Sequence, residues 1–231
     1  IQTAGGSDSL TVSNQVFGAE QSYVGNLGVD TNQSALINVD NVLYFIDKAR
    51  RAIVKVSNQG MNILSDIDIS RMIEETFISN SESGVNYALG YDRERGYVFF
   101  TFQGSRETYG YDHLKKVWTS KYSFAPLSYA VCENDMLSFS GDSEGNIAHR
   151  HDNESSPGSF YGSNYSSKIS LISAGKNPSV VKAYNAIGLE STIPMDVKIT
   201  NSDQSVSFDK DRFNKKERSH YTDIPFDGSH R

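Results

Sequence analysis

The chain has 231 residues and a net charge of −6, from 22 basic and 28 acidic side chains, with one cysteine, Cys132. This length can bury a real core in one large or two modest domains, and the acidic balance argues against a protein that grips nucleic acid over its whole surface. A lone cysteine excludes an intrachain disulfide framework. No stretch approaches the roughly 20 apolar residues of a membrane helix.

Cysteine context and chain ends suggest two further expectations. Cys132 lies in the apolar sequence SYAVC with no basic neighbour, so we expect a packed side chain and not a nucleophile. The sequence shows no signal peptide, begins at Ile1 and not at Met, and ends in a polar run. We therefore expect a processed or excised piece of a longer protein.

The first 35 residues predict a short strand, at residues 10–17, surrounded by polar loops. The strand pattern then strengthens over residues 34–56. The runs VLYFI, at residues 42–46, and YVFFTF, at residues 97–102, are apolar on both faces. Such strands must be covered on both sides, as the inner strands of stacked propeller blades are. We also expect Trp118 to anchor neighbouring sheets to each other.

Four strand-turn-strand units share an aspartate at the start of a polar turn: Asp47, Asp92, Asp112 and Asp142. An aspartate carboxylate can accept hydrogen bonds from amides two residues ahead, which favours a turn. The steps from 47 to 92 and from 92 to 142 are 45 and 50 residues, near the roughly 40–50 residues of one four-stranded blade. We predict repeated blades, with Asp112 in an additional hairpin inside one blade. The alternative is that these turns recur without a repeat, because they are common in β proteins.

One helix is predicted, over residues 66–79, because Ile69, Met72, Ile73 and Phe77 recur at helical spacing while Glu74 and Glu75 face solvent. A short helix of this kind more often covers a sheet than performs chemistry.

Composition changes after residue 152. Residues 153–167 are rich in Ser, Asn and Gly and predict a linker. Strands are expected beyond it at 168–173, 180–189, 195–200 and 204–208. The prediction is thus a mainly β chain: β-propeller-type blades with one short helix at 1–152, a linker at 153–167, and a β-rich segment with a charged tail at 168–231. That tail is mildly basic at its start; a solvated arm is favoured over a phosphate contact.

Motifs for catalysis or cofactor binding are missing from the sequence. His149 and His151 would share one face of a strand, but no third His or Cys stands at ligand spacing, so no metal site is predicted. The glycine-containing stretches lack the Lys-Ser/Thr pair of a phosphate loop, and no nucleophile elbow occurs. We predict no enzyme and no cofactor. A carboxylate pair acting on a sugar stays open, because its spacing is three-dimensional.

The succession of these segments resembles a known family. The segments that carry the similarity are, in order, VLYFIDKARRAIVKVS, a helix, YALGYDRERGYVFFTF, TYGYDHLKKVWTSKYSFAP, SFSGDSEGNIAHRHD and a Lys-x-Tyr strand at residues 182–184. Through them the chain is similar to the tail nozzle proteins of short-tailed bacteriophages. The likeness is strongest to those of crAss-like phages, called muzzle or stabilization proteins, and covers about residues 5–228.

This resemblance implies a structural protein of the virion tail, assembled in the host bacterial cytoplasm. Such proteins form a homo-oligomeric ring, usually six-fold, that closes the DNA exit channel below the portal and adaptor and carries fibres or other distal parts. The expected partners are other tail proteins, a companion fragment of the same precursor, and double-stranded DNA that passes through the lumen during ejection without specific binding. No membrane anchor is expected. The alternatives are a β-propeller protein that binds or cleaves glycans and a β-propeller interaction scaffold from a cell.

Overall fold

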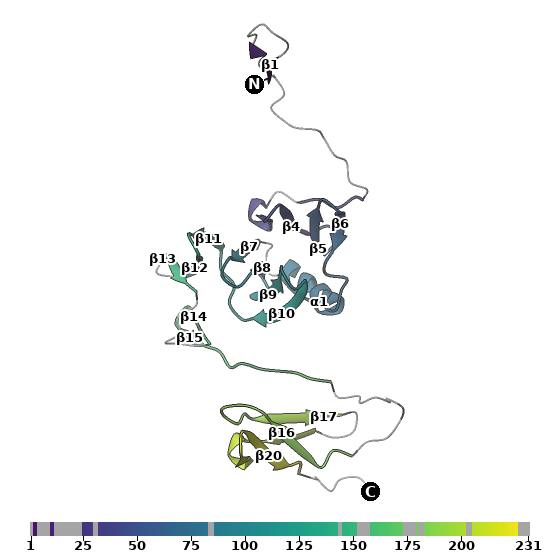
Figure 1. The fold of residues 1–231 in the computed structure, drawn as a ribbon, viewed down its shortest axis with the longest axis vertical. Helices are drawn as coiled ribbons and strands as arrows, with labels where there is room; N and C mark the ends of the chain where they lie inside the picture. The colour runs from purple at the N-terminus through teal and green to yellow at the C-terminus, as the bar shows by residue number, and fades with distance from the viewer. Residues whose placement is uncertain are drawn as a thin grey trace. The chain divides into compact units, whose positions relative to one another are not determined.

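The computed structural model describes residues 2–3, 10–11, 25–29, 32–82, 86–142, 145–151, 158–172, 179, 183–201 and 205–225. The described part is mainly β, with one α-helix and several small antiparallel sheets, which confirms the predicted class. The chain divides into two compact units, Ile1–Lys168 and Ile169–Arg231, shown in Figure 1. The described sheets are open and form no closed barrel, so a propeller stays a prediction.

Two four-stranded meanders form the body of the first unit (Figure 1). The first contains β3 (Leu36–Val39), β4 (Val42–Asp47), β5 (Ala52–Ser57) and β6 (Gly60–Ile63). The second contains β7 (Tyr87–Asp92), β8 (Tyr97–Phe102), β9 (Glu107–Asp112) and β10 (Val117–Tyr122). Both predicted hairpins of the second meander therefore lie in one sheet, as the sequence indicated for Asp112.

A smaller sheet, two short strand pairs and one 3-10 turn also belong to the first unit. The third sheet contains β11 (Ser128–Cys132), β12 (Asp135–Asp142) and β13 (Gly145–Arg150). Inside the stretch predicted as a linker, β14 (Ser159–Phe160) pairs with β15 (Ser163–Asn164). The other short elements are β1 (Gln2–Thr3) with β2 (Leu10–Thr11), and the 3-10 turn η1 (Gln33–Ala35).

The second meander lies between two hydrophobic cores. Its strand β8 alternates sides, so that Val98 and Phe100 enter a core shared with Tyr44 and Ile46 of the first meander. The next residue, Phe99, enters a core with Phe124 on the other face. This two-sided burial is what the uninterrupted apolar run predicted, because a sheet with one wet face would alternate apolar and polar residues. Strand β4 is also buried on both faces, because Tyr44 and Ile46 enter the shared core while Phe45 enters a third core on the opposite face.

One glycine allows the second and third sheets to approach closely. The Tyr129 ring of β11 stacks on Phe99 with an interplanar angle of 15°, and its hydroxyl lies 2.6 Å from Thr101 Oγ1. A Cβ on Gly90 of β7 would lie 2.4 Å from the Tyr129 ring. Any larger residue at position 90 must therefore displace this ring.

The aspartates do not mark equivalent points of a repeat, which corrects the spacing argument from sequence. Asp47 ends the second strand of its sheet, Asp92 the first and Asp112 the third. The three sheets begin at Leu36, Tyr87 and Ser128, so their first strands are 51 and 41 residues apart. Turn chemistry is local, and it therefore marks a hairpin without revealing which hairpin of a sheet it is.

The helix α1 (Ser70–Glu82) begins four residues later than predicted. Ile73 and Phe77 are buried in the core between the first two sheets, and Glu74 and Glu75 are exposed as expected. Met72, which the spacing placed on the apolar face, is 41% exposed. The helix packs through a narrow apolar stripe, because Thr76 and Asn80 fill the remaining buried positions.

The second unit holds two small sheets. One has the order β16 (Ala186–Leu189), β20 (Ser219–Asp223), β19 (Asn214–Lys216), and the other pairs β17 (Val197–Thr200) with β18 (Ser205–Phe208), followed by the 3-10 turn η2 (Lys210–Arg212). The predicted strand at 168–173 is wrong over 168–172, which form no strand, and residue 173 lies outside the described residues. Of the strand expected at 180–189, residues 183–185 form no strand, β16 covers the last four residues, and residues 180–182 lie outside the described residues. Strand-like composition alone does not supply a pairing partner.

Cys132 is exposed, which contradicts the expectation of a packed thiol. It is the last residue of the edge strand β11 and pairs with Asp135 across a tight turn. Its neighbour Val131 is also exposed. The strand end therefore extends beyond the sheet that covers the rest of β11, which an apolar local context could not reveal.

Replacing Gly90 with Ala should destabilise the first unit by about 1–3 kcal/mol, because the added methyl overpacks the contact with Tyr129. The measurement is the free energy of unfolding from urea titration. Gly28→Ala is the matched control, since a Cβ there meets no atom within 4 Å, and it should change stability by less than about 0.5 kcal/mol. Equal effects of the two changes would contradict the close packing at Gly90.

Candidate functional site

Three buried aspartates close turns at the ends of β4, β7 and β9. The Asp47 Oδ1 accepts a hydrogen bond from the Arg50 amide at 2.9 Å, and its Oδ2 accepts one from the Gly28 amide at 3.0 Å. The Arg50 guanidinium lies 3.3 Å from the same carboxylate. One side chain thus completes a turn and also holds the segment at residues 25–29 against the first sheet.

The other two turns repeat this arrangement. Asp92 Oδ1 accepts from the Arg95 amide at 3.1 Å, while Asp112 Oδ1 accepts from the amides of Leu114 at 3.0 Å and Lys115 at 2.8 Å. The common acceptor geometry reaches three residues ahead, one further than the sequence predicted. In each case the third residue is basic and lies near the carboxylate, at 4.0 Å for Arg95 and 3.2 Å for Lys115.

The pKa of Asp112 is lowered chiefly by the hydrogen bond from the Lys115 amide, and further by the Lys115 ammonium and the Leu114 amide, against the opposing effect of burial. Hydrogen bonds to a carboxylate favour its charged form. The same pairing raises the pKa of Lys115. The fourth predicted aspartate, Asp142, ends β12 opposite Gly145, and its side chain lies outside the described residues.

His113 connects the turns of the first two sheets, a role that the sequence did not suggest. Its amide donates to the Gly96 carbonyl at 2.9 Å, which joins the turn after β7 to the turn after β9. Its Nδ1 lies 2.7 Å from the Tyr44 hydroxyl of β4, and its Nε2 lies 3.9 Å from Asp40. A histidine among four residues of a turn gives no sequence signal for a contact 69 residues away.

Trp118 lies on the edge strand β10, partly buried against the core between the first two sheets. Its indole ring lies 5.2 Å from Tyr111 and 5.6 Å from Phe100, measured between ring centroids. Its Nε1 donates to the Leu64 carbonyl, which follows β6, at 3.4 Å. The side chain therefore contacts both meanders from their rim.

Buried tyrosine hydroxyls are held in structural hydrogen bonds. Tyr109 contacts Thr76 of α1 at 2.6 Å, and Tyr161 contacts Ser138 of β12 at 2.9 Å. Burial raises the pKa of Tyr161 to about 12 and moves that of Tyr109 upward as well. These hydroxyls stay protonated at neutral pH and serve as hydrogen-bonding groups that join elements.

His149 and His151 share one face of the third sheet, as predicted, but contact different serines. The His149 ring lies 2.8 Å from Ser140 Oγ, and the His151 ring lies 2.7 Å from Ser138 Oγ. Among the described residues, no group of three His, Cys, Asp or Glu side chains could hold a metal ion.

The second unit begins with an exposed apolar segment, residues 169–172. Ile169, Leu171 and Ile172 are 72%, 86% and 98% exposed, and the segment belongs to no strand. Within the part of the chain that is described, no helix is long and apolar enough to cross a membrane. A contiguous exposed apolar stretch usually marks a surface that contacts another macromolecule.

Stacked sheets, turns closed by buried carboxylates and an exposed apolar segment are features of a structural protein, and the described residues bring together no catalytic group. Comparison with protein families identifies the family to which the chain belongs. The Crassvirus muzzle protein family matches residues 10–142, and the Crassvirus muzzle protein C-terminal domain matches residues 155–227. The chain therefore belongs to the Crassvirus muzzle protein family, as the sequence resemblance indicated. No curated protein matches the chain.

Family membership makes this chain a structural component of a phage, related to the tail of the virion. A structural family of this kind implies a role other than catalysis. The two matched regions leave residues 143–154 between them, while the two compact units meet at Lys168 and Ile169. The predicted domain limits stay a prediction.

Asp112→Asn should destabilise the protein at pH 7, and the difference from wild type should shrink as the pH falls. The pKa of Asp112 is lower in the folded state than its unfolded value of about 3.9. The Asp112 charge therefore contributes fully to the free energy of unfolding above that unfolded pKa, and this contribution is lost as the pH falls through the folded-state pKa. Urea unfolding from pH 7 to pH 3 measures this difference. Asp66→Asn, at an exposed aspartate, controls for the change from carboxylate to amide. A difference that stays constant over this range would contradict the role of the charge.

Proposed function

We propose that this chain forms part of a homo-oligomeric ring, six-fold in the simplest case, that closes the DNA exit channel of a crAss-like phage tail and holds distal tail parts. The observation that supports this most directly is the family match over both units. Neighbouring ring proteins, fibres and a companion fragment of the same precursor are the proposed partners. Closed rings form when one surface of a subunit binds a different surface of the next.

The exposed segment at residues 169–172 is the proposed ring contact. Burying Ile169, Leu171 and Ile172 would remove apolar surface from water, at about 25 cal/mol for each Å². The segment also leaves backbone groups open for pairing, and extended segments add readily to the edge of a sheet in another chain. The first unit offers such edges in β6 and β10, each of which is the last strand of its sheet.

Replacing both Leu171 and Ile172 with Asp should reduce self-association, because the charges cannot be buried in an apolar contact without partners. Sedimentation velocity across a range of concentrations, with negative-stain images, measures the assembly. Ile67→Asp is the matched control at an exposed isoleucine of the first unit and should assemble like wild type. A wild-type chain that remains a monomer at every concentration would argue against ring formation through this segment.

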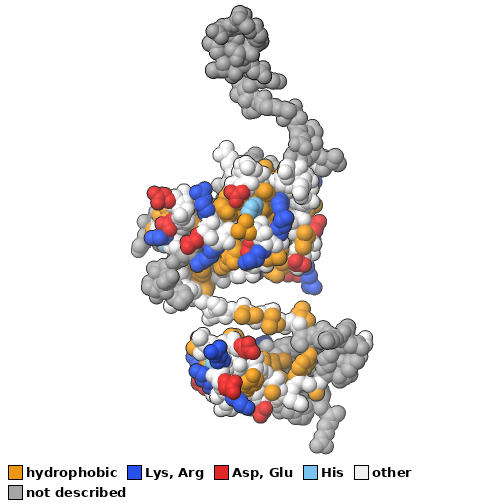
Figure 2. Space-filling view, in the orientation of Figure 1, with side chains coloured by type: hydrophobic (Ala, Val, Ile, Leu, Met, Phe, Trp, Pro, Cys, Tyr) orange, Lys and Arg blue, Asp and Glu red, His pale blue; other side chains and the backbone are white. Residues whose placement is uncertain are grey.

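The charge distribution supports a lumen that DNA passes without being held. The chain is acidic overall, and Figure 2 shows basic and acidic side chains interspersed over the visible face of the first unit, without a large patch of one sign. Retention of DNA depends on clusters of Lys and Arg that neutralise phosphates. Mixed charge lets a duplex slide.

We expect weak retention of the chain on immobilised duplex DNA at low salt, where phosphate contacts are strongest. The measurement is the salt concentration at which the protein elutes, compared with a basic protein of similar size. Elution below roughly 0.1 M salt fits a lumen without specific contacts. Retention into high salt would show that the protein grips DNA.

A further inference from the structure

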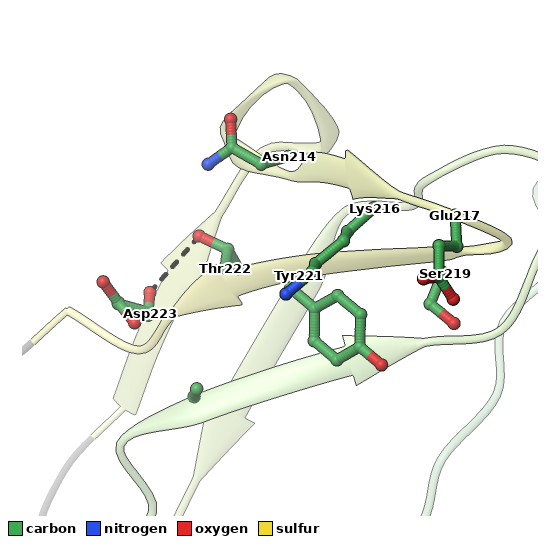
Figure 3. Close-up of a pocket in the computed structure, with 8 residues that line it drawn as sticks. Asn214, Lys216, Glu217, Ser219, Tyr221, Thr222 and Asp223 are labelled. Carbon is green, nitrogen blue, oxygen red and sulfur yellow. Dashed lines mark hydrogen bonds between the residues drawn. The ribbon is translucent and has the colours of Figure 1, made fainter.

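An open pocket lies on one face of the sheet β16-β20-β19 in the second unit (Figure 3). It encloses about 600 Å³ and is lined chiefly by polar side chains. The Tyr221 ring lies at its centre, with Asp223 and Asn214 toward one end and Ser219 and Glu217 toward the other. The stacked sheets and the apolar segment described above involve none of these residues.

Strand register explains why this face is hollow. Residues directly opposite each other in an antiparallel pair point to the same side of the sheet. Tyr221 lies opposite Gly188 on one side and Asn214 on the other, while Asp223 lies opposite Ala186. Strand β16 therefore contributes only a hydrogen atom and a methyl group to this face, and the longer side chains of β19 and β20 form its walls.

Gly188 determines where the aromatic ring lies. A Cβ at this position would lie 2.6 Å from Tyr221 Cε1, which is too close for any side chain. The ring can lie across β16 only because residue 188 is glycine, and it remains 47% exposed. The sheet thus presents an aromatic surface to solvent in a fixed position.

The same strand separates this face from the interior of the unit. His220 and Thr222 alternate with Ser219, Tyr221 and Asp223 and are buried at 5% and 7% exposure, although Thr222 also contributes to the pocket lining. Ser219, Tyr221 and Asp223 consequently stand on the opposite, solvent-facing side. Burial of His220 and Thr222 contributes to folding of the unit. An exposed aromatic ring with polar groups around it contributes little to folding, so its position needs another explanation.

We propose that this pocket binds a neutral carbohydrate. A sugar ring has a face of C–H groups, which packs on the negative face of an aromatic ring, and hydroxyls around its edge that require donors and acceptors. Carboxylate, amide, hydroxyl and ammonium groups line the pocket around Tyr221. An apolar ligand would leave these groups unpaired, which is costly.

Charge in the pocket selects against acidic ligands. Lys216 supplies one positive charge, whereas Glu217 and Asp223 supply two negative charges. A phosphate, sulfate or uronic acid would face a net negative lining. The carboxylates instead suit hydroxyl donors, since charge-assisted hydrogen bonds are stronger than neutral ones. The geometry points to a neutral oligosaccharide, such as a segment of a surface polysaccharide.

The test uses the full chain on an array of neutral, sialylated and sulfated glycans, followed by calorimetric titration with the neutral glycan that binds best. Tyr221→Ala should weaken that affinity by at least about tenfold, through loss of the stacking surface. Tyr221→Phe should stay within about threefold of wild type, because the ring face is kept. Gly188→Ala should weaken binding by displacing the ring.

Tyr184→Ala is the matched control, at an exposed tyrosine of the same unit that does not line the pocket, and should bind like wild type. Circular dichroism establishes that each variant is folded. Absence of glycan binding by the folded wild-type chain, preference for acidic glycans, or unchanged binding by Tyr221→Ala would each overturn the proposal. Sedimentation of the same variants separates this outcome from a failure of ring assembly, which involves other residues.

Discussion

Burial of a carboxylate beside its own turn is the constraint on which the first unit depends. Asp47, Asp92 and Asp112 are each 1–2% exposed, and a buried charge is stable only when it is paired and hydrogen-bonded. Each is satisfied by a backbone amide three residues ahead and by a basic side chain at that same position. Because each turn closes within four residues, β4, β7 and β8 can stay buried over most of their length and pack on two faces.

Much of this arrangement could be predicted from sequence, because hairpin chemistry and two-sided apolar runs are local properties. The mainly β class and the extra hairpin at Asp112 follow from such patterns. The partners of Trp118 and His113 could not be predicted, since Leu64 and Tyr44 lie 54 and 69 residues away. The exposure of Cys132 and the missing strand at 168–172 also depend on which surfaces meet. Sequence spacing likewise treated Asp47 and Asp92 as equivalent, although they close different hairpins of their sheets.

The two units differ in how their apolar side chains are buried. In the first, aromatic side chains join successive sheets, as Phe100 does with Tyr44 and Trp118. Among the described residues of the second, the buried apolar ones are Phe208 and Phe213, while Ile169, Leu171 and Ile172 are exposed. A partner that covered this apolar segment would stabilise the folded unit. This division is consistent with the proposed tail role, in which the first unit keeps its shape and residues 169–172 contact a neighbour.

At two positions a glycine lets a tyrosine ring lie directly against the backbone, with different results. At Gly90 the missing side chain admits Tyr129 from the neighbouring sheet, and the ring is then stacked on Phe99 and hydrogen-bonded to Thr101. At Gly188 it admits Tyr221 from the adjacent strand of the same sheet, and nearly half of that side chain remains open to solvent. The Tyr129 ring therefore contributes to packing between two sheets. The Tyr221 ring lies against its glycine but stays about half open to solvent, and the proposed ligand would cover the open part.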